Sequence, residues 1–176
     1  MRLVAASLLF LIGAPAAAYR VEAGDQMVHA SAGGTFNFVR HRLVTRETPP
    51  SLLTVGLGYD YALTSSLSLL AELQPGLGDR YLGLPLAAGV RYRVPGLAAP
   101  LSPYATLAAT ATLGLPLGPP PLHVNVGVRA ALGVEYFVSN AFAVGAEFAL
   151  GSGPLLLPEF DLESRADLML GCGYRF

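Results

Sequence analysis

Apolar and polar residues alternate at every second position along most of this chain, and 122–150 shows the pattern most clearly. One stripe of 123–137 is apolar throughout and consists of Val124, Val126, Val128, Ala130, Leu132, Val134 and Tyr136. The other is polar or small and consists of His123, Asn125, Gly127, Arg129, Ala131, Gly133 and Glu135. A period of two is that of a β-strand, whereas a helix repeats about every 3.6 residues. The alternation resumes after Ser139 and Asn140, so 122–150 is predicted to form a β-hairpin.

The same alternation predicts six further strands, which brings the total to eight. They lie at 27–38, 51–61, 67–74, 81–94, 101–113 and 165–176, with loops at 39–50, 75–80, 114–121 and 151–164. Each strand is close to the roughly 9–11 residues that a tilted strand needs to cross a bilayer. Pro85 removes one ladder hydrogen bond, so a β-bulge is predicted there.

The sparse charge of the polar stripe decides which side of the sheet meets water. A soluble barrel would carry a charged exterior, but this stripe is rich in glycine and carries only an occasional Arg or Glu. A barrel with its apolar stripe in lipid and its small polar residues in the lumen fits better. The predicted fold is therefore all-β, an eight-stranded antiparallel up-and-down transmembrane β-barrel with a lipid-facing apolar exterior.

Composition supports a membrane protein without transmembrane helices. The chain is 53% hydrophobic, with a mean hydropathy of +0.51, which is high for a soluble protein. The long charge-free stretch 94–128 contains seven prolines, which prevent a continuous helix. The basic residues other than His are all Arg and the net charge is −1, so there is no basic patch for nucleic acid.

Residues 1–18 have the form of a secretory signal peptide, with 19–176 as one barrel domain. Arg2 gives a short basic region, 3–12 an apolar core, and 16–18 an Ala-Ala-Ala cleavage site. Cys172 is the single cysteine, so no intramolecular disulfide is expected.

Charged residues of both signs fall on the predicted lumen stripe. They are Asp60, Glu72, Arg91, Arg93, Arg129, Glu135, Glu147, Asp167 and Arg175. Eight strands enclose only enough room for side chains, so these groups are expected to pair and close the lumen without an open pore. Arg129 is expected to pair with Glu147 and Glu135. The alternative reading is an ion or proton path along these charges.

Aromatic residues and loop lengths predict the orientation. The even-numbered predicted strands end in Tyr59 and Tyr61, Tyr92, Tyr136 and Phe137, and Tyr174 and Phe176, and Phe142 begins the seventh. These rings are expected to form an interfacial girdle at the rim that carries the short turns. Short turns mark the periplasmic side of such barrels, so both termini are expected there and the long loops outside.

The last residues, Gly-Cys-Gly-Tyr-Arg-Phe, resemble the C-terminal recognition signal of bacterial outer-membrane proteins, with Tyr174 and Phe176 as its aromatics. The stretches 133–137 and 144–148 are similar to the last hairpin of OmpA-like and OmpX-like barrel domains. The resemblance implies a monomer in the cell outer membrane, inserted by the barrel-assembly machinery and surrounded by lipids and lipopolysaccharide. Arg40, Arg42 and Arg46 in loop 39–50 would suit lipopolysaccharide phosphates.

Candidate chemistry is limited. His29 and Ser31 form a His-x-Ser pair of the kind that barrel-type lipid A deacylases use, but that family places the pair on the lipid face near the outer rim, and here both residues fall on the lumen stripe. His41 and His123 have no Cys or carboxylate at metal-ligand spacing. We expect no catalytic, metal or cofactor site and a structural or surface-interaction role. The alternatives are a lipid-modifying barrel hydrolase and a narrow channel for small solutes.

Overall fold

The computed structural model describes residues 21–39, 52–78, 81–95, 100–117, 122–157 and 161–176. The signal peptide expected at 1–18, most of the loop at 39–50 and its arginines lie outside these residues. Within them, no helix is long and apolar enough to cross a bilayer.

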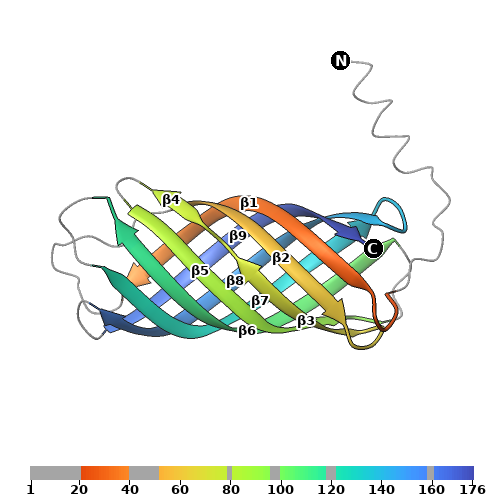
Figure 1. The fold of residues 1–176 in the computed structure, drawn as a ribbon, viewed down its shortest axis with the longest axis horizontal. Coiled ribbons are helices and arrows are strands. Elements are labelled where there is room, and N and C mark those ends of the chain that lie inside the picture. Colours follow the sequence, from red (N-terminus) through yellow and green to blue (C-terminus); the bar gives the residue numbers. More distant parts are fainter. Residues whose placement is uncertain (1–20, 40–51, 79–80, 96–99, 118–121, 158–160) are drawn as a thin grey trace, which may run out of the picture.

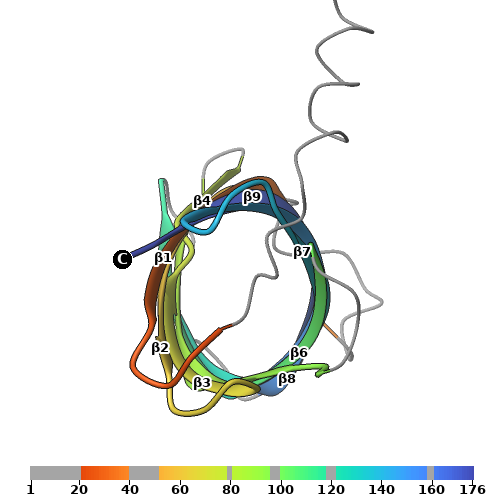
Figure 2. The ribbon, with the colours of Figure 1, turned by 90° about the vertical axis from the view of Figure 1, so that its right-hand side faces the viewer.

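One antiparallel sheet closes on itself to form a barrel (Figures 1 and 2). Its strands are β1 (Gln26–Val39), β2 (Leu52–Ala62), β3 (Leu67–Leu73), β4 (Gly76–Gly78), β5 (Tyr81–Arg93), β6 (Leu101–Pro116), β7 (His123–Phe137), β8 (Phe142–Leu157) and β9 (Asp161–Arg175). The short β4 continues β3, because both pair with β2 on one side and β5 on the other. The barrel therefore has eight strands, and the predicted fold class is confirmed.

The stagger of the strands sets their tilt. Cross-strand partners followed from Val28 on β1 once around the barrel return to β1 at Phe38, ten residues farther along. With about 3.3 Å per residue and about 4.8 Å between strands, this stagger inclines the strands by about 40° to the axis. A tilt in this range is typical of membrane barrels.

The β-bulge predicted at Pro85 is wrong, because Pro85 stays in register with Thr112 on β6. The carbonyl of Pro85 accepts the backbone N–H of Gln74 (2.9 Å), so its missing N–H also faces that side. The ladder is interrupted there, between β3 and β4, without a change of register. The register shift lies elsewhere, between Val124 and Asn125 on the β7–β8 edge.

The strands near the 114–121 and 151–164 loops are longer than predicted. β6 continues to Pro116, β8 continues to Leu157 and β9 begins at Asp161. The alternation fades at 151–154, but the backbone of β8 still pairs there with β9, up to Leu155 opposite Asp161. Part of the predicted 75–80 loop is β4. Loop length therefore separates the two ends of the barrel less clearly than the sequence suggested.

Side chains alternate between an exposed exterior and a buried lumen. At the end of the barrel that holds the C-terminus, Tyr59, Tyr61, Tyr92, Phe142, Tyr174 and Phe176 are exposed on the outside. Phe137 was expected in this girdle but is buried inside with Met27 and Ala143. It has the same parity as Glu135, which means that it lies an even number of residues away along the strand and points to the same side of the sheet. Leu70, which interrupted the predicted alternation of its strand, is also buried in the lumen.

Candidate functional site

Most of the charged side chains of the described residues lie in the lumen. Its carboxylates include Asp60, Glu72, Glu135, Glu147 and Asp167, and its guanidinium groups include those of Arg91, Arg93, Arg129 and Arg165. They come from six of the strands, because every second residue of a strand points inward. A charge in this position is costly unless it has a partner, so the pairing of these groups is the central feature of the site.

The first ion-pair cluster joins β2, β5 and β7 near the end that holds the C-terminus. Arg91 Nη1 lies 2.7 Å from Asp60 Oδ2 and 3.3 Å from Glu135 Oε1. Arg93 bridges the same two carboxylates, at 2.9 Å and 3.2 Å, and also donates to Ser68. Two guanidinium groups thus neutralise two carboxylates on strands far apart in the sequence.

The second cluster surrounds Arg129 on β7, whose side chain is fully buried. Its guanidinium binds Glu147 on β8, Glu72 on β3 (3.1 Å) and Asp167 on β9 (3.3 Å). Arg165 adds a second contact to Asp167 (3.4 Å). Arg129 therefore links three different strands across the lumen.

Arg91 also connects the two clusters. Its Nη2 lies 3.6 Å from Glu147 and 3.9 Å from Glu72, both of which bind Arg129. The Tyr104 ring stacks 4.3 Å from the Arg91 guanidinium, and its hydroxyl donates to Glu147 (3.0 Å). Planar guanidinium groups stack well on aromatic faces, so Tyr104 supports Arg91 in this position.

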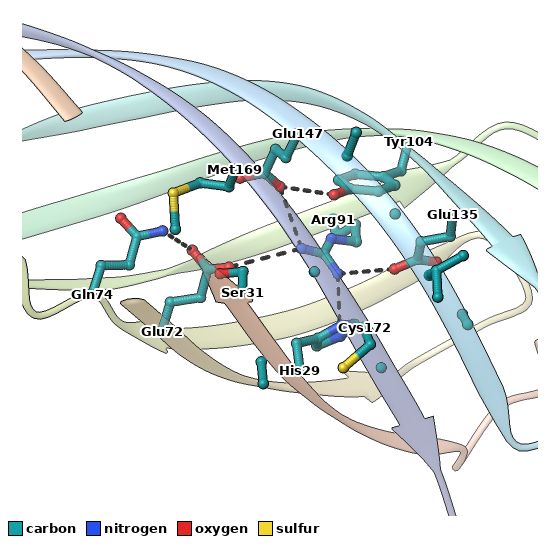
Figure 3. A pocket seen from close by; sticks show the side chains of 17 residues that line it. His29, Ser31, Glu72, Gln74, Arg91, Tyr104, Glu135, Glu147, Met169 and Cys172 are labelled. Carbon is teal, nitrogen blue, oxygen red and sulfur yellow. Dashed lines mark hydrogen bonds and ion pairs between the residues drawn. The ribbon is translucent and has the colours of Figure 1, made fainter. Parts of the chain in front are cut away.

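A small cavity of about 50 Å³ lies between these groups (Figure 3). His29, Glu72, Arg91, Glu135 and Glu147 point into it from different strands. Its volume is enough for only a few water molecules. The wall of β8 and β9 is lined there by small residues, including Gly145, Gly171 and Gly173.

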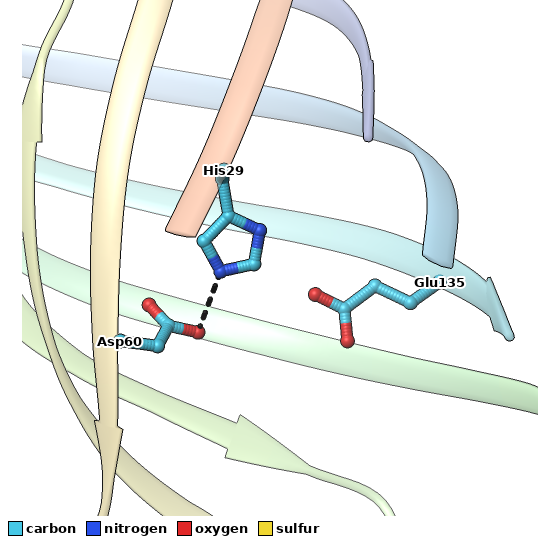
Figure 4. Close-up of side chains that lie close together, drawn as sticks. All are labelled: His29, Asp60 and Glu135. Atoms are coloured by element: carbon cyan, nitrogen blue, oxygen red, sulfur yellow. Dashed lines mark ion pairs between the residues drawn. The ribbon is translucent and has the colours of Figure 1, made fainter. Parts of the chain in front are cut away.

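His29, Asp60 and Glu135 bring metal-ligand atom types within 4.8 Å of one another (Figure 4). Arg91 Nη1 lies within 3.3 Å of a side-chain nitrogen or oxygen of each of them. The guanidinium already supplies the positive charge that this group needs, so we assign it as part of the first ion-pair cluster.

Of the two partners expected for Arg129, Glu147 is correct and Glu135 is wrong. Arg129 binds Glu147, but Glu135 binds Arg91 and Arg93 instead. Arg129 and Glu135 both lie on β7, six residues and therefore roughly 20 Å apart along the strand. Arg175 is not in a central cluster, because it lies near the end of β9 and pairs with Asp25 (2.9 Å).

Sequence reasoning missed Arg165, although it shares the parity of Asp167 and could have been found from that pattern. It also missed the polar neutral partners of the charges, such as Ser68, Tyr104 and Gln74, whose amide oxygen accepts from Arg165 (3.2 Å). Their role depends on which side chains meet across the lumen, which parity alone does not give.

The remaining candidate residues divide between the two faces. His29 and Ser31 lie on the lumen side, and both line the cavity of about 50 Å³. Tyr174 and Phe176, the expected assembly signal, are exposed on the outside at 54% and 63%. Cys172 is a free thiol on the same outer face.

Solved structures with the same fold include bacterial outer-membrane barrels. Neisserial surface protein A aligns with a TM-score of 0.68 at 15% identity, over 87% of this chain and 99% of the other. The N-terminal barrel domain of Pseudomonas aeruginosa OprF gives 0.60 at 16% identity, over 85% and 97%. The attachment invasion locus protein Ail of Yersinia pestis gives 0.58 at 15% identity, over 89% and 100%.

At such low identity the similarity establishes the fold, which agrees with the OmpA-like and OmpX-like barrel architecture expected from the sequence. No protein-family model and no curated protein sequence matches the chain.

Proposed function

We propose that this chain is a small outer-membrane β-barrel protein with a structural or surface-interaction role and a lumen closed by ion pairs. The observation that carries the proposal is its outer face. From one rim to the other, the outward positions of the described strands carry no charged side chain, and large apolar residues such as Leu53, Leu132 and Leu170 are about 70% exposed. An apolar surface of this extent matches a hydrocarbon environment.

The polar outward residues of β8 and β9 support the same environment. Ser152 and Ser164 face outward on neighbouring strands, and their hydroxyls lie 3.1 Å apart. The Ser152 hydroxyl also lies 3.3 Å from the carbonyl of Glu163. Polar groups in or near hydrocarbon need partners within the protein, and these two hydroxyls provide them for each other.

The location is tested by fractionating cells that express the full chain and examining the outer-membrane fraction by gel electrophoresis. A folded barrel is expected to migrate faster before boiling than after it. A chain recovered in the soluble fraction, or one with a single mobility, would contradict the proposal.

A closed lumen is supported by the two ion-pair clusters and by the small size of the cavity between them. Purified barrel added to a planar lipid bilayer is therefore expected to give no steady conductance. Regular single-channel steps would favour the alternative, a narrow channel for small solutes.

A lipid-modifying hydrolase is a weaker candidate. His29 and Ser31 face the lumen, where the acyl chain of a membrane lipid has no access through the paired wall of β1 with β2 and β9. We therefore propose a non-enzymatic role. Release of fatty acid from lipid A by the purified barrel, abolished by Ser31→Ala, would contradict it.

The proposed partners are outer-membrane lipids, lipopolysaccharide and the barrel-assembly machinery, with the chain as a monomer. Two proteins of the same fold are named for the cell surface or for attachment, which supports a surface role. Arg40, Arg42 and Arg46, outside the described residues, are proposed to meet lipopolysaccharide phosphates. Replacing all three by Glu should weaken binding of the purified barrel to lipopolysaccharide, while Glu47→Gln should not.

Assembly through the C-terminal strand is proposed from the exposed aromatics Tyr174 and Phe176. Phe176→Ala should lower the amount of barrel in the outer membrane, whereas Phe142→Ala, another exposed aromatic of the same rim, should leave it nearly unchanged. Equal losses in both variants would show that the C-terminal residue has no special part in assembly.

A further inference from the structure

His29 on β1 holds one ring nitrogen between two groups of opposite hydrogen-bonding character. Its Nε2 lies 3.2 Å from Asp60 Oδ2 and 3.3 Å from Arg91 Nη1 (Figures 3 and 4). An ionised carboxylate only accepts hydrogen bonds and a guanidinium only donates them. Nε2 can therefore satisfy one of these neighbours at a time, and the presence of a hydrogen on Nε2 decides which.

Arg91 Nη1 is in a similar position. It carries two hydrogens, but Asp60, Glu135 and His29 all lie within 3.3 Å of it. At most two of the three can each receive a hydrogen in a normal bond. Any change at His29 must therefore alter how Arg91 is shared between the two carboxylates.

We propose that His29 is a proton-operated switch that sets the partners of Arg91. When Nε2 carries a lone pair, it accepts from Arg91 and holds the guanidinium in the first ion-pair cluster. When the ring is protonated, Nε2 donates to Asp60 and its positive charge repels Arg91. Histidine is the side chain that most often changes its charge near physiological pH, so the switch is tested by lowering the pH.

The second ion-pair cluster offers Arg91 a new position. Glu147 and Glu72 lie 3.6 Å and 3.9 Å from Arg91 Nη2, and both line the same cavity as His29. Gly171 and Gly173 form part of the cavity wall, and Met169 lines it next to Glu147. Protonation of His29 thus changes how the hydrogens of Arg91 are divided among Asp60, Glu135, Glu147 and Glu72.

Charged and titratable groups face this region from the other strands of the barrel. They are Asp60 on β2, Glu72 on β3, Arg91 and Arg93 on β5, Tyr104 on β6, Arg129 and Glu135 on β7, Glu147 on β8 and, on β9, Arg175 toward the near end of the barrel and Asp167 farther along the lumen. The arginines oppose a further positive charge on His29, while the carboxylates favour it. The test must therefore separate the titration of His29 from that of the carboxylates.

The test is nuclear magnetic resonance on the full barrel in detergent micelles, with the His29 ring and the Arg91 guanidinium nitrogens assigned through bonds to their backbone amides. The pH is lowered from about 8 to about 5. The Arg91 signals are expected to move with the same midpoint as the His29 ring. In His29→Gln the Arg91 signals should stay constant over this range, because the Gln side chain does not change its charge. Movement of the Arg91 signals in this variant would come from the carboxylates and would overturn the proposal.

His123→Gln is the matched control. His123 lies at the start of β7, at the opposite end of that strand from Glu135, and its Nδ1 is 3.3 Å from the Tyr81 hydroxyl. The movement of the Arg91 signals should therefore persist in this variant. Constant Arg91 signals while His29 titrates would overturn the proposal, as would a His29 ring that does not titrate. If His29→Gln does not fold, unequal midpoints of His29 and Arg91 in the natural chain still overturn it.

Discussion

The outer face and the lumen of the barrel meet in neighbouring residues of a single strand. On β7, Val128 is 60% exposed on the outside, and the next residue, Arg129, is fully buried and binds three carboxylates. The same strand therefore meets two different surroundings. Outside, the requirement is general, because any apolar shape suits hydrocarbon and no charge does. Inside, the requirement is specific, because each charge needs particular partners.

The two faces should therefore fail in different ways. A substitution in the lumen does its damage by leaving other groups without partners, so its effect depends on how many partners the original residue had. A substitution on the outer face does its damage by its own transfer into lipid, so its effect depends on depth. The following variants test this contrast.

Arg129→Met is expected to have the largest effect. It preserves apolar packing volume but leaves Glu72, Glu147 and Asp167 without their shared guanidinium. Removing one partner of a buried ion pair costs about 3–5 kcal/mol. The free energy of unfolding should fall by about this amount in a urea titration in lipid vesicles, followed by far-UV circular dichroism.

Arg175→Met is the matched control for that variant. Arg175 pairs with Asp25 near the end of the barrel, where both side chains are partly exposed to solvent. Pairs of this kind contribute about 0–1 kcal/mol. Equal losses in the two variants would show that position in the lumen does not matter.

Val128→Arg comes next, because it places a charge on the outer face well away from both rims. Such a substitution costs roughly 2–4 kcal/mol near the bilayer midplane and about 0–1 kcal/mol near the interfaces. Leu101→Arg, at the rim end of β6, is the control for depth. Heat-modifiable mobility and urea titration should both show a larger loss for Val128→Arg, and a reversed order would contradict the assignment of the outer face.

The exterior could be predicted from the sequence, because parity along each strand is local information. Every second residue of 123–137 faces outward, and no knowledge of the other strands is needed to see it. The predicted strand ends were wrong where the alternation of apolar and polar residues stops but the backbone pairing continues. β8 continues past Ser152 to Leu157, although the apolar stripe weakens there, since the backbone of β9 still supplies its hydrogen bonds.

The lumen could be predicted as a set of residues but not as a set of pairs. Parity placed Asp60, Arg91 and Glu135 inside, yet their contact depends on the ten-residue stagger that brings β2, β5 and β7 together. That stagger follows from the whole closed sheet. Arg129 and Glu135 were expected to pair because both are inward and oppositely charged, whereas their separation along β7 prevents it.

Gly133→Ala should have an intermediate effect and tests how tightly the lumen is packed. A Cβ at Gly133 would overlap the ring of Tyr104, which supports Arg91 and donates to Glu147. Overpacking of this kind costs about 1–3 kcal/mol. Gly34→Ala on the outer face is the control, because the nearest atom to its Cβ would be 3.7 Å away in Phe36. Urea titration should separate the two variants, and equal stability would show that the Tyr104 ring moves freely.

Asn125→Gln should have the smallest effect, although Asn125 is also in the lumen. The Asn125 amide donates to the carbonyl of Gly153 (3.0 Å) and lines a separate small cavity of about 30 Å³ with Thr110 and Thr112. The longer amide of Gln has space there and can still donate, so the loss should be under about 1 kcal/mol. Asn125→Leu removes the donor and should cost more, about 1–3 kcal/mol, because the carbonyl of Gly153 loses its side-chain partner. A loss in Asn125→Gln as large as that in Val128→Arg would mean that the lumen does not tolerate polar changes better than the outer face, and the contrast between the two faces would then be wrong.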